Sequence, residues 1–262
     1  MRIVIKVGTS TLAHAGGRLN IRRVELLCKV LSDLKNAGNQ ILLVSSGAIG
    51  MGVGKLGLEG RPADMPGKQA AAAVGQCELM YTYDKLFAEY NHTVAQILLT
   101  ADDIQDKRRS THVQDTLERL LDWGVLPIVN ENDAVSSDEI GIQTTIGEND
   151  SLSAIVAKLI GADMLVLLSD INGLYTEDPR VNPDATLIPL VKEITPEILA
   201  LAGGTGTSLG SGGMATKLKA AQMSMAAGID MIITNGENPE KLYALLDGQE
   251  IGTRFVGRSE TQ

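Results

Sequence analysis

Six short apolar runs, separated by longer stretches with helical spacing, constrain the fold of this chain more than any other feature. The runs are rich in Ile, Val and Leu and do not alternate with polar residues, so each is expected to be a strand covered on both faces. The predicted strands are 3–7, 41–44, 94–99, 126–129, 164–168 and 231–233. Strands that alternate with helices are typical of βαβ units, and we therefore predict an α/β fold: one αβα sandwich with a mainly parallel sheet.

Helical spacing fills most of the intervening stretches. After Asn20, a predicted N-cap, apolar residues recur every three or four positions from Ile21 to Leu34, and Gly38 closes the helix. Trp123, at the end of a later helix, is expected to pack in the core or as a hydrophobic staple, and not to form a ligand platform. The other predicted helices are 69–90, 115–123, 150–160 and 214–227, and the predicted loops are 130–150 and 202–213.

Composition limits the partners of the chain. It has 262 residues, of which 44% are hydrophobic, and a formal net charge of −9. The charge argues against a nucleic acid or an anionic membrane as the main partner, and we expect neither. The first residues already form a predicted strand, so we expect no signal peptide, and no apolar run approaches the roughly 18 residues of a membrane span. Cys28 and Cys77 are both expected to pack inside helices, which fits a cytoplasmic location.

Polar clusters directly follow four of the predicted strands. Each lies at the carboxyl end of its strand, which is the edge at which open parallel sheets bind ligands. Any single cluster could be a simple turn, since Gly, Ser, Asn and Asp are turn residues, but four at one edge favour a ligand site. The clusters are Lys6-Val7-Gly8-Thr9-Ser10, Ser45-Ser46-Gly47-Ala48, Asn130-Glu131-Asn132-Asp133 and Ser169-Asp170.

Two lysines and a glycine-rich stretch indicate a phosphate ligand. Lys6 lies near the end of a buried strand, where a lysine is costly unless it meets an anion or leaves the sheet edge for solvent. Ser46 opens the next helix, as an anion site or as a plain N-cap. The stretch 202–213 runs into the helix that carries Lys217, an arrangement that suits polyphosphate but is also compatible with a flexible surface loop. It lacks the spacing of a P-loop.

Four carboxylates fall in or beside the loop 130–150: Glu131, Asp133, Glu148 and Asp150. Crowded carboxylates repel one another, so the cluster predicts Mg²⁺, lysines or a substrate ammonium as its partner. Glycosidases also pair carboxylates, but their chemistry requires neither the glycine-rich stretch nor the two lysines.

Taken together, these segments resemble the glutamate 5-kinase family, one branch of the amino acid kinase superfamily. The match runs in order from residue 1 to about 256. The segments that carry the resemblance are Lys6-Val7-Gly8-Thr9-Ser10, Ser45-Ser46-Gly47-Ala48, Asn130-Glu131-Asn132-Asp133, Gly147-Glu148-Asn149-Asp150, Gly173-Leu174-Tyr175-Thr176-Glu177-Asp178-Pro179-Arg180 and Gly212-Gly213-Met214-Ala215-Thr216-Lys217.

The resemblance implies a three-layer αβα sandwich with an eight-stranded, mainly parallel sheet. It implies one kinase domain over residues 1–262, whose N-terminal part binds L-glutamate and whose C-terminal part binds ATP. ATP and Mg²⁺ would serve to phosphorylate the glutamate γ-carboxylate, in the first step of proline biosynthesis. Proline is implied as a feedback inhibitor, and we expect a homo-oligomer.

The resemblance also implies roles for individual residues. Lys6 and Lys217 would be catalytic, stabilising the transferring phosphoryl group, with Asp150 orienting them. No residue is assigned as a metal ligand. The expected glutamate ligands are Ser46, Asp133 and Asn149, and the expected ATP ligands are Lys6, Ser169, Asp170, Ser211, Gly212, Gly213, Met214, Ala215, Thr216 and Lys217.

The chemistry of these residues agrees with the implied reaction. Phosphoryl transfer depends on positioning and charge neutralisation, and a substrate carboxylate is already ionised at pH 7, so no general base is required. Asp133 suits an α-ammonium group, whereas backbone amides or Asn149 suit a carboxylate.

The chain departs from the family pattern in three places. We expect it to lack the RNA-binding type of C-terminal domain found in many relatives, its loop 134–146 looks longer, and Glu148 stands where aspartate is expected. Acetylglutamate kinase, aspartokinase and a non-catalytic amino-acid sensor are the alternatives. The first two usually carry Gly-Gly after the first lysine motif, where this chain has Gly8-Thr9.

Overall fold

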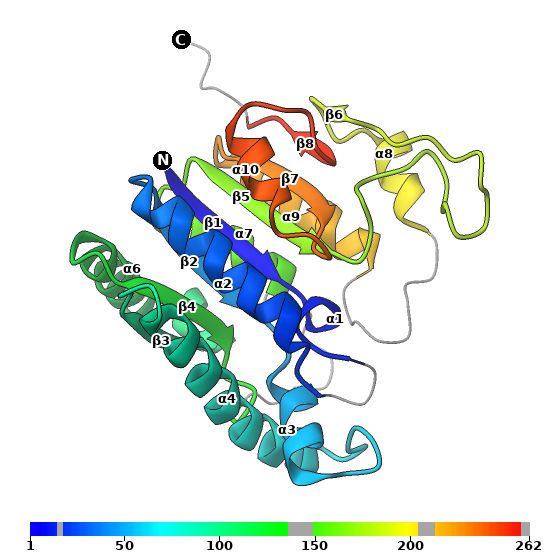
Figure 1. Ribbon diagram of the computed structural model, residues 1–262. Helices are drawn as coiled ribbons and strands as arrows, with labels where there is room; N and C mark the ends of the chain where they lie inside the picture. The colour runs from blue at the N-terminus through cyan, green and yellow to red at the C-terminus, as the bar shows by residue number, and fades with distance from the viewer. Residues whose placement is uncertain (15–17, 136–148, 204–212, 258–262) are drawn as a thin grey trace.

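An eight-stranded sheet runs through the part of the chain that the computed structural model describes, residues 1–14, 18–135, 149–203 and 213–257 (Figure 1). The strand order is β3-β4-β2-β1-β5-β7-β8-β6. All neighbouring strands are parallel except β7 and β8. The strands are β1 (Arg2–Val7), β2 (Gln40–Ser45), β3 (Val94–Leu99), β4 (Leu126–Glu131), β5 (Met164–Ser169), β6 (Leu190–Val191), β7 (Asp230–Asn235) and β8 (Thr253–Phe255).

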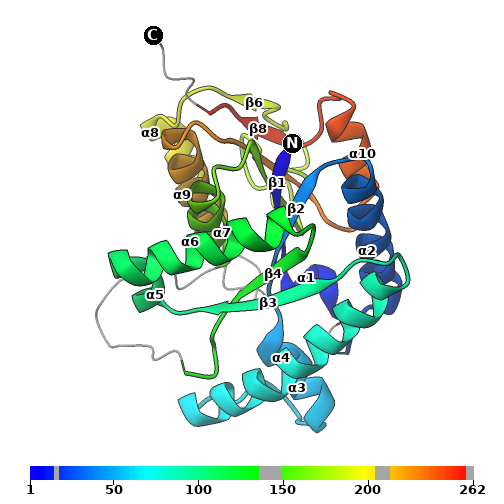
Figure 2. The ribbon, with the colours of Figure 1, turned by 90° about the vertical axis from the view of Figure 1, so that its left-hand side faces the viewer.

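Helices cover both faces of this sheet (Figure 2). Helices α2, α4 and α10 lie on one face, and α6, α7 and α9 lie on the other. The helices are α1 (Thr9–Leu12), α2 (Ile21–Asn36), α3 (Ala48–Leu56), α4 (Met65–Ala88), α5 (Ala101–Gln105), α6 (Lys107–Asp122), α7 (Asn149–Leu159), α8 (Pro196–Ala200), α9 (Met214–Ala226) and α10 (Lys241–Leu246), with a 3₁₀ turn at Leu201–Gly203. The three-layer αβα sandwich and its eight-stranded, mainly parallel sheet are confirmed.

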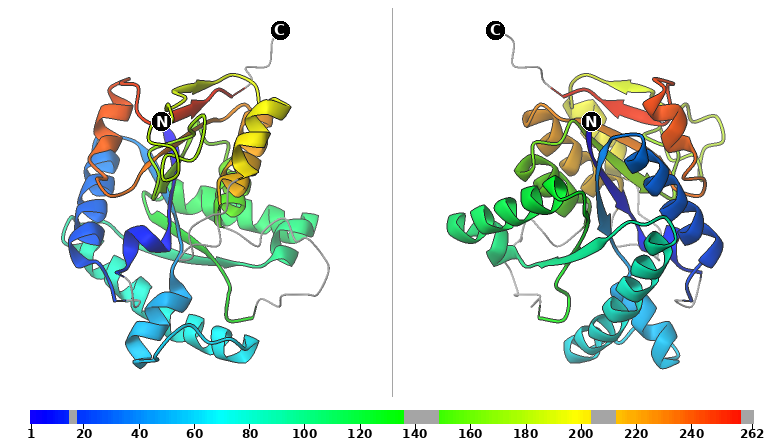
Figure 3. Two further views of the ribbon diagram at one scale, coloured as in Figure 1. Left: turned by 90° about the vertical axis from the view of Figure 1, so that its right-hand side faces the viewer. Right: turned by 60° about the vertical axis from the view of Figure 1, so that its left-hand side comes forward.

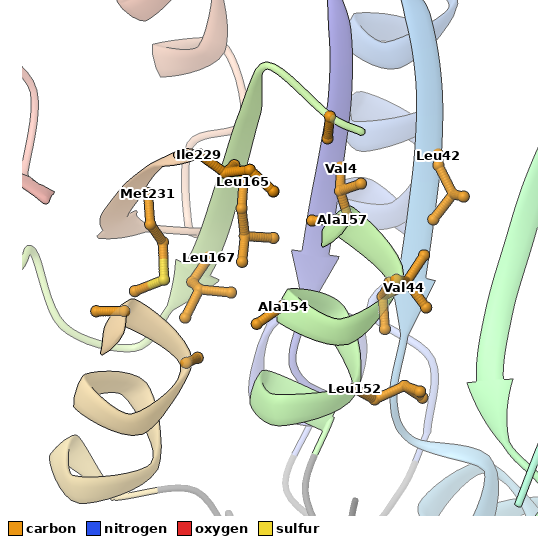
Figure 4. Packing of buried hydrophobic residues seen from close by; sticks show 14 of the residues in the cluster. Val4, Leu42, Val44, Leu152, Ala154, Ala157, Leu165, Leu167, Ile229 and Met231 are labelled. Atoms are coloured by element: carbon orange, nitrogen blue, oxygen red, sulfur yellow. The ribbon is translucent and has the colours of Figure 1, made fainter. Parts of the chain in front are cut away.

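Each face of the sheet packs its own hydrophobic core, because successive side chains of a strand point to opposite faces. Val4 of β1 lies beside Ala157 of α7 in one core, and Leu152 belongs to the same core farther along α7, as Figure 4 shows. The neighbours of Val4 in β1, Ile3 and Ile5, belong to the other core, beneath α2 and α4. The central strands therefore carry apolar residues at consecutive positions, as at Ile3–Ile5 and Ile41–Val44, which is the pattern that the sequence shows.

The carboxyl ends of the central parallel strands meet at the edge that carries α3. Both views of Figure 3 show α3 and one end of α4 beyond this edge, with the N-terminus at the opposite end. The two helices touch backbone to backbone. A Cβ added to Gly52 would lie 1.8 Å from the carbonyl oxygen of Ala71, and one added to Gly75 would lie 1.8 Å from that of Ala48. Gly52 of α3 and Gly75 of α4 therefore allow the two helices to pack closely.

The six strands predicted from the sequence are all present, and the five predicted helices are present with shifted ends. Helix α6 begins at Lys107 because Asp106 caps the backbone N–H of Arg109; its first turns are polar, so the apolar pattern shows only from Leu117 onward. The prediction for Trp123 was wrong, since its side chain is 71% exposed after the last turn of α6.

Of the two cysteines predicted to be buried, Cys28 is buried and Cys77 is exposed on α4. The residues of α4 that face the core include Gln76 and Leu79, so that Cys77 turns outward between them. Among the described residues, no helix combines the length and the apolar content that crossing a bilayer requires.

Candidate active site

The polar clusters of the sequence lie together at the carboxyl edge of the sheet. In the register of the parallel strands, Val7 of β1 lies beside Ser45 of β2 on one side and Leu168 of β5 on the other. The polypeptide therefore leaves β1 at Gly8, β2 at Ser46 and β5 after Ser169, and these three points are neighbours. A ligand at this edge can be contacted by residues far apart in the sequence.

Asp150 lies between two lysines at this edge. Lys6 Nζ is 2.7 Å from Asp150 Oδ1, and Lys217 Nζ is 3.2 Å from Oδ2. Asp150 is in the first turn of α7, where the helix dipole favours an anion, and Thr216 donates a hydrogen bond of 2.9 Å to its Oδ2. One carboxylate thus sets the position of both ammonium groups, which arrive from β1 and from the first turn of α9.

Burial restricts the motion of these three charged side chains and strengthens the electrostatic interactions among them. The Asp150 side chain is 1% exposed, Lys217 is 7% exposed and Lys6 is 12% exposed. Burial raises the pKa of the Asp150 carboxyl, but the positive charges of Lys6 and Lys217 outweigh burial and lower that pKa to about 2. Asp150 is therefore ionised at neutral pH, and the three residues carry a net positive charge. An anion is the ligand that such a site attracts.

A second group of polar side chains lies beside the first, on the side of β2 and β4. Asn149 donates from Nδ2 to Ser46 Oγ (2.8 Å) and to Asn130 Oδ1 (3.2 Å). Asn130 in turn donates from Nδ2 to Gln76 Oε1 (2.9 Å) on α4. Gly47 follows Ser46 with φ of 101°, a left-handed conformation that lets the chain turn from β2 directly into α3.

Asp133 lies in the turn after β4, on the wall of a cavity of about 320 Å³. The wall is formed by α3, α4, β3 and the residues after β4, and it includes Gln76, Cys77 and Gln96. A larger hollow of about 570 Å³ lies over α6 and is lined by Trp123 but by none of the polar clusters. The smaller cavity is the one that Asp133, a predicted substrate ligand, lines.

The predicted nucleotide ligands are described only in part. Ser169 donates from Oγ to Asp170 Oδ1 (3.1 Å) at the end of β5. The segment from Gly213 to Lys217 forms the start of α9. Ser211 and Gly212 lie outside the described residues, as does most of the glycine-rich stretch 202–213.

The predicted carboxylate cluster divides in the structure. Asp150 belongs to the two lysines, Glu131 and Asp133 line the cavity beside β4, and Glu148 lies outside the described residues. Lysines were one of the three partners expected for this cluster, and for Asp150 they are the partners found. Within the described ranges, no group of three His, Cys, Asp or Glu side chains is placed to hold a metal ion.

Sequence reasoning gave no role to Asn130 and overlooked Gln76. The signal for Gln76 was a polar residue inside the apolar stripe of α4, between Ala72 and Leu79, both of which are buried. A polar side chain on the buried face of a helix has a partner in most structures, and here the partner comes from β4.

Comparison with known proteins shows the family of the chain. A model of the amino acid kinase family matches residues 1–235. The glutamate 5-kinase of Clostridium perfringens is 54% identical over 257 residues, which cover 98% of this chain and 96% of that protein. The glutamate 5-kinase of Listeria monocytogenes (strain EGD-e) is 51% identical over 99% of this chain and 94% of that protein.

Two solved structures share the fold at lower identity. An isopentenyl phosphate kinase of T. acidophilum has a TM-score of 0.66 and 20% identity, and covers 97% of this chain and 99% of its own. A carbamate kinase of Giardia lamblia has a TM-score of 0.65 and 22% identity, and covers 98% of both chains. At these identities the likeness concerns the fold alone.

Proposed function

The chain belongs to the amino acid kinase family, and from that membership we propose that it transfers the γ-phosphoryl group of ATP to the γ-carboxylate of glutamate. This is the reaction of a glutamate 5-kinase, and its product enters proline biosynthesis. The observation that carries the proposal is similarity above 50% identity to proteins of that name over almost the whole chain. The polar groups at the sheet edge suit each part of the reaction.

Lys6 and Lys217 are proposed to stabilise the transferring phosphoryl group. In the reaction, a γ-carboxylate oxygen attacks the γ-phosphorus, the bond to the β,γ-bridging oxygen breaks, and ADP leaves with the electron pair. Negative charge on the phosphoryl oxygens and on the leaving oxygen must be balanced, and fixed cations in a site with little water do this well. Asp150 holds both ammonium groups in place and is proposed to orient them without touching the substrate.

ATP is proposed to bind at Ser169, Asp170 and the segment 211–217, which includes Gly213, Met214 and Ala215. Mg²⁺ would arrive with the nucleotide, where it neutralises charge on the phosphates. A dedicated set of three protein ligands is absent from the described residues. Mg²⁺ usually keeps several waters and binds through phosphates and one or two carboxylates.

Glutamate is proposed to bind at Ser46, Asp133 and Asn149, beside the cavity of about 320 Å³. Asp133 offers a carboxylate to the α-ammonium group. This feature separates the proposed substrate from N-acetylglutamate, whose acylated nitrogen carries no charge and offers no cation to Asp133.

Substrate-dependent release of ADP tests the proposal. The purified chain is incubated with ATP and Mg²⁺, and with glutamate, N-acetylglutamate or aspartate in turn. We expect ADP release with glutamate and little with the other two, and hydroxylamine should trap the acyl phosphate product. Faster turnover of N-acetylglutamate or aspartate would assign the chain to another branch of the family. ATP that stays intact with all three, while glutamate still binds, would indicate an amino-acid sensor.

Proline is proposed as an inhibitor that binds in the glutamate site, since it offers an ammonium group and an α-carboxylate but no γ-carboxylate to phosphorylate. A homo-oligomer and the division of one domain into glutamate-binding and ATP-binding parts both stay predictions.

A further inference from the structure

A chain of side-chain amides connects α4 with the proposed glutamate site. Gln76 Oε1 accepts from Asn130 Nδ2, Asn130 Oδ1 accepts from Asn149 Nδ2, and the same Nδ2 donates to Ser46 Oγ. The four residues come from α4, β4, α7 and the end of β2. Asn130 is 1% exposed and Gln76 is 9% exposed, so this relay (Gln76, Asn130, Asn149 and Ser46) is largely shielded from water.

A backbone group fixes the polarity of the relay. The N–H of Glu131 donates to the side-chain atom of Asn130 that lies 2.9 Å away, and this atom must be an oxygen because a backbone N–H can only donate. The other end of the Asn130 amide is then a donor, and it requires an acceptor from Gln76. Asn149 must in turn direct its NH₂ group at Asn130, and the backbone oxygen of Ser45 at 3.4 Å requires the same orientation.

This polarity leaves an acceptor without a partner at the site. Asn149 Oδ1 is buried, and within the described part of the chain no hydrogen bond reaches it. Gln76 Nε2, at the other end of the relay and on the wall of the cavity, is likewise buried and without a partner there. Buried polar atoms without partners are uncommon, and at a ligand site they indicate the groups that the ligand supplies.

We propose that Gln76 is a positioning residue for substrate recognition: by holding the amide of Asn130, it makes Asn149 present an oxygen to the ligand, and this oxygen binds the substrate ammonium group together with Asp133. The inference rests on the proposed function. It differs from the sequence-based interpretation of Asn149 as a partner for a carboxylate, because the NH₂ group that such a contact needs is already directed at Ser46 and Asn130.

The choice of an ammonium partner follows from hydrogen-bonding chemistry. A carbonyl oxygen accepts only, so it suits an ammonium group and repels a carboxylate. Asp133 is a carboxylate that lines the neighbouring cavity. Two acceptors at one end of a site select a cation there. If Gln76 no longer fixed the relay, Asn130 and Asn149 could rotate together and present an NH₂ group, and the preference for a cation would weaken.

Two substitutions and two ligands test this role. Gln76→Met keeps the length of the side chain but accepts no hydrogen bond, whereas Gln76→Glu keeps an acceptor for Asn130 and loses Nε2. Glutarate has both carboxylates of glutamate without the ammonium group. For each protein, the KM for glutamate and the inhibition constant of glutarate are measured by ADP release. Gln249→Met, at an exposed position after α10, is the matched control.

In Gln76→Met, the ratio of the glutarate inhibition constant to the glutamate KM should fall by about tenfold or more, because the ammonium group loses one hydrogen bond. The ratio should stay within about twofold of wild type in Gln76→Glu and in the control. General damage to the site would weaken both ligands together and leave the ratio unchanged. Gln76→Ala replaces Gln76→Met if the latter does not fold.

Binding can also be followed without catalysis. Cys77 lines the same cavity and is exposed, whereas Cys28 is buried, so alkylation of the folded chain reports on Cys77. Glutamate should protect Cys77 at lower concentration than glutarate in wild type and lose this advantage in Gln76→Met. The inference is overturned if the ratio of the glutarate inhibition constant to the glutamate KM is unchanged in Gln76→Met. It is also overturned if that ratio falls as far in Gln76→Glu as in Gln76→Met. An inactive wild type rejects the proposed function instead, and the two failures are therefore distinguishable.

Discussion

Replacing Asp150 with asparagine removes the negative charge that holds two buried ammonium groups together. Asp150→Asn keeps the size of the side chain and an oxygen that can accept from Thr216. Lys6 and Lys217 would remain near each other, 12% and 7% exposed, without an anion between them. Removal of one partner from a buried ion pair is costly, because the remaining charge keeps its desolvation penalty.

The size of the effect follows from the pKa of Asp150. It is about 2 in the folded chain against an ordinary 3.8, and this difference corresponds to about 2 kcal/mol of stability at pH 7. Because the folded-state pKa is the lower one, the contribution is complete above a pH of about 5 and is lost as the pH falls toward 2. About half of it remains at pH 3.

Equilibrium unfolding in urea measures this contribution. The signal should be far-UV circular dichroism, since the single Trp123 is already exposed in the folded chain and its fluorescence will change little. Asp150→Asn should lower the unfolding free energy at pH 7 by about 2 kcal/mol or more and approach wild type as the pH falls from 5 to 3. Asp178→Asn, at an exposed ion pair with Arg180, should change it little. A difference between wild type and Asp150→Asn that is absent, or constant with pH, would refute the reasoning.

Three further predictions concern catalysis. Lys6→Ala and Lys217→Ala should each lower kcat by about a hundredfold or more, since each removes one preorganised cation, and near-normal turnover in both would contradict the mechanism. Asp133→Asn should raise the KM for glutamate by about tenfold and leave the KM for ATP unchanged, because it weakens the contact with the ammonium group; the reverse pattern would place Asp133 with the metal or nucleotide. Proline should inhibit wild type competitively, so that higher glutamate relieves it, and millimolar proline without effect at sub-saturating glutamate would reject a shared site.

The sheet was predictable because its central strands are buried on both faces, and such strands are visible in the sequence as continuous apolar runs. Strands β6 and β8 have two and three residues, too few for any pattern, and only the family resemblance implied them. Trp123 shows a different limit: the sequence places it at the end of α6, but exposure depends on which side of the helix faces the sheet in the last turn.

For the site, the sequence predicted which segments reach the sheet edge but could not predict their contacts. Lys6 and Lys217 were each suspected from their own surroundings. The contact of Gln76 with Asn130 joins residues 54 positions apart through one hydrogen bond. One glutamine in an alanine-rich helix does not form a recognisable sequence motif. Such contacts depend on the position of α4 over β4, which is a property of the packed fold.

The first turn of α7 joins the two halves of the site. Successive residues of a helix point about 100° apart around its axis, and here Asn149 points to Ser46 and Asn130 while Asp150 points to Lys6 and Lys217. The proposed glutamate ligand and the residue that orients the two lysines are therefore adjacent on one rigid element. A shift of α7 would move both together, so the distance between the bound carboxylate and the cations that stabilise the transferring phosphoryl group would be set by how α7 packs on β1 and β2. Leu152, Ala154 and Ala157 make that packing (Figure 4), and they are each at most 1% exposed.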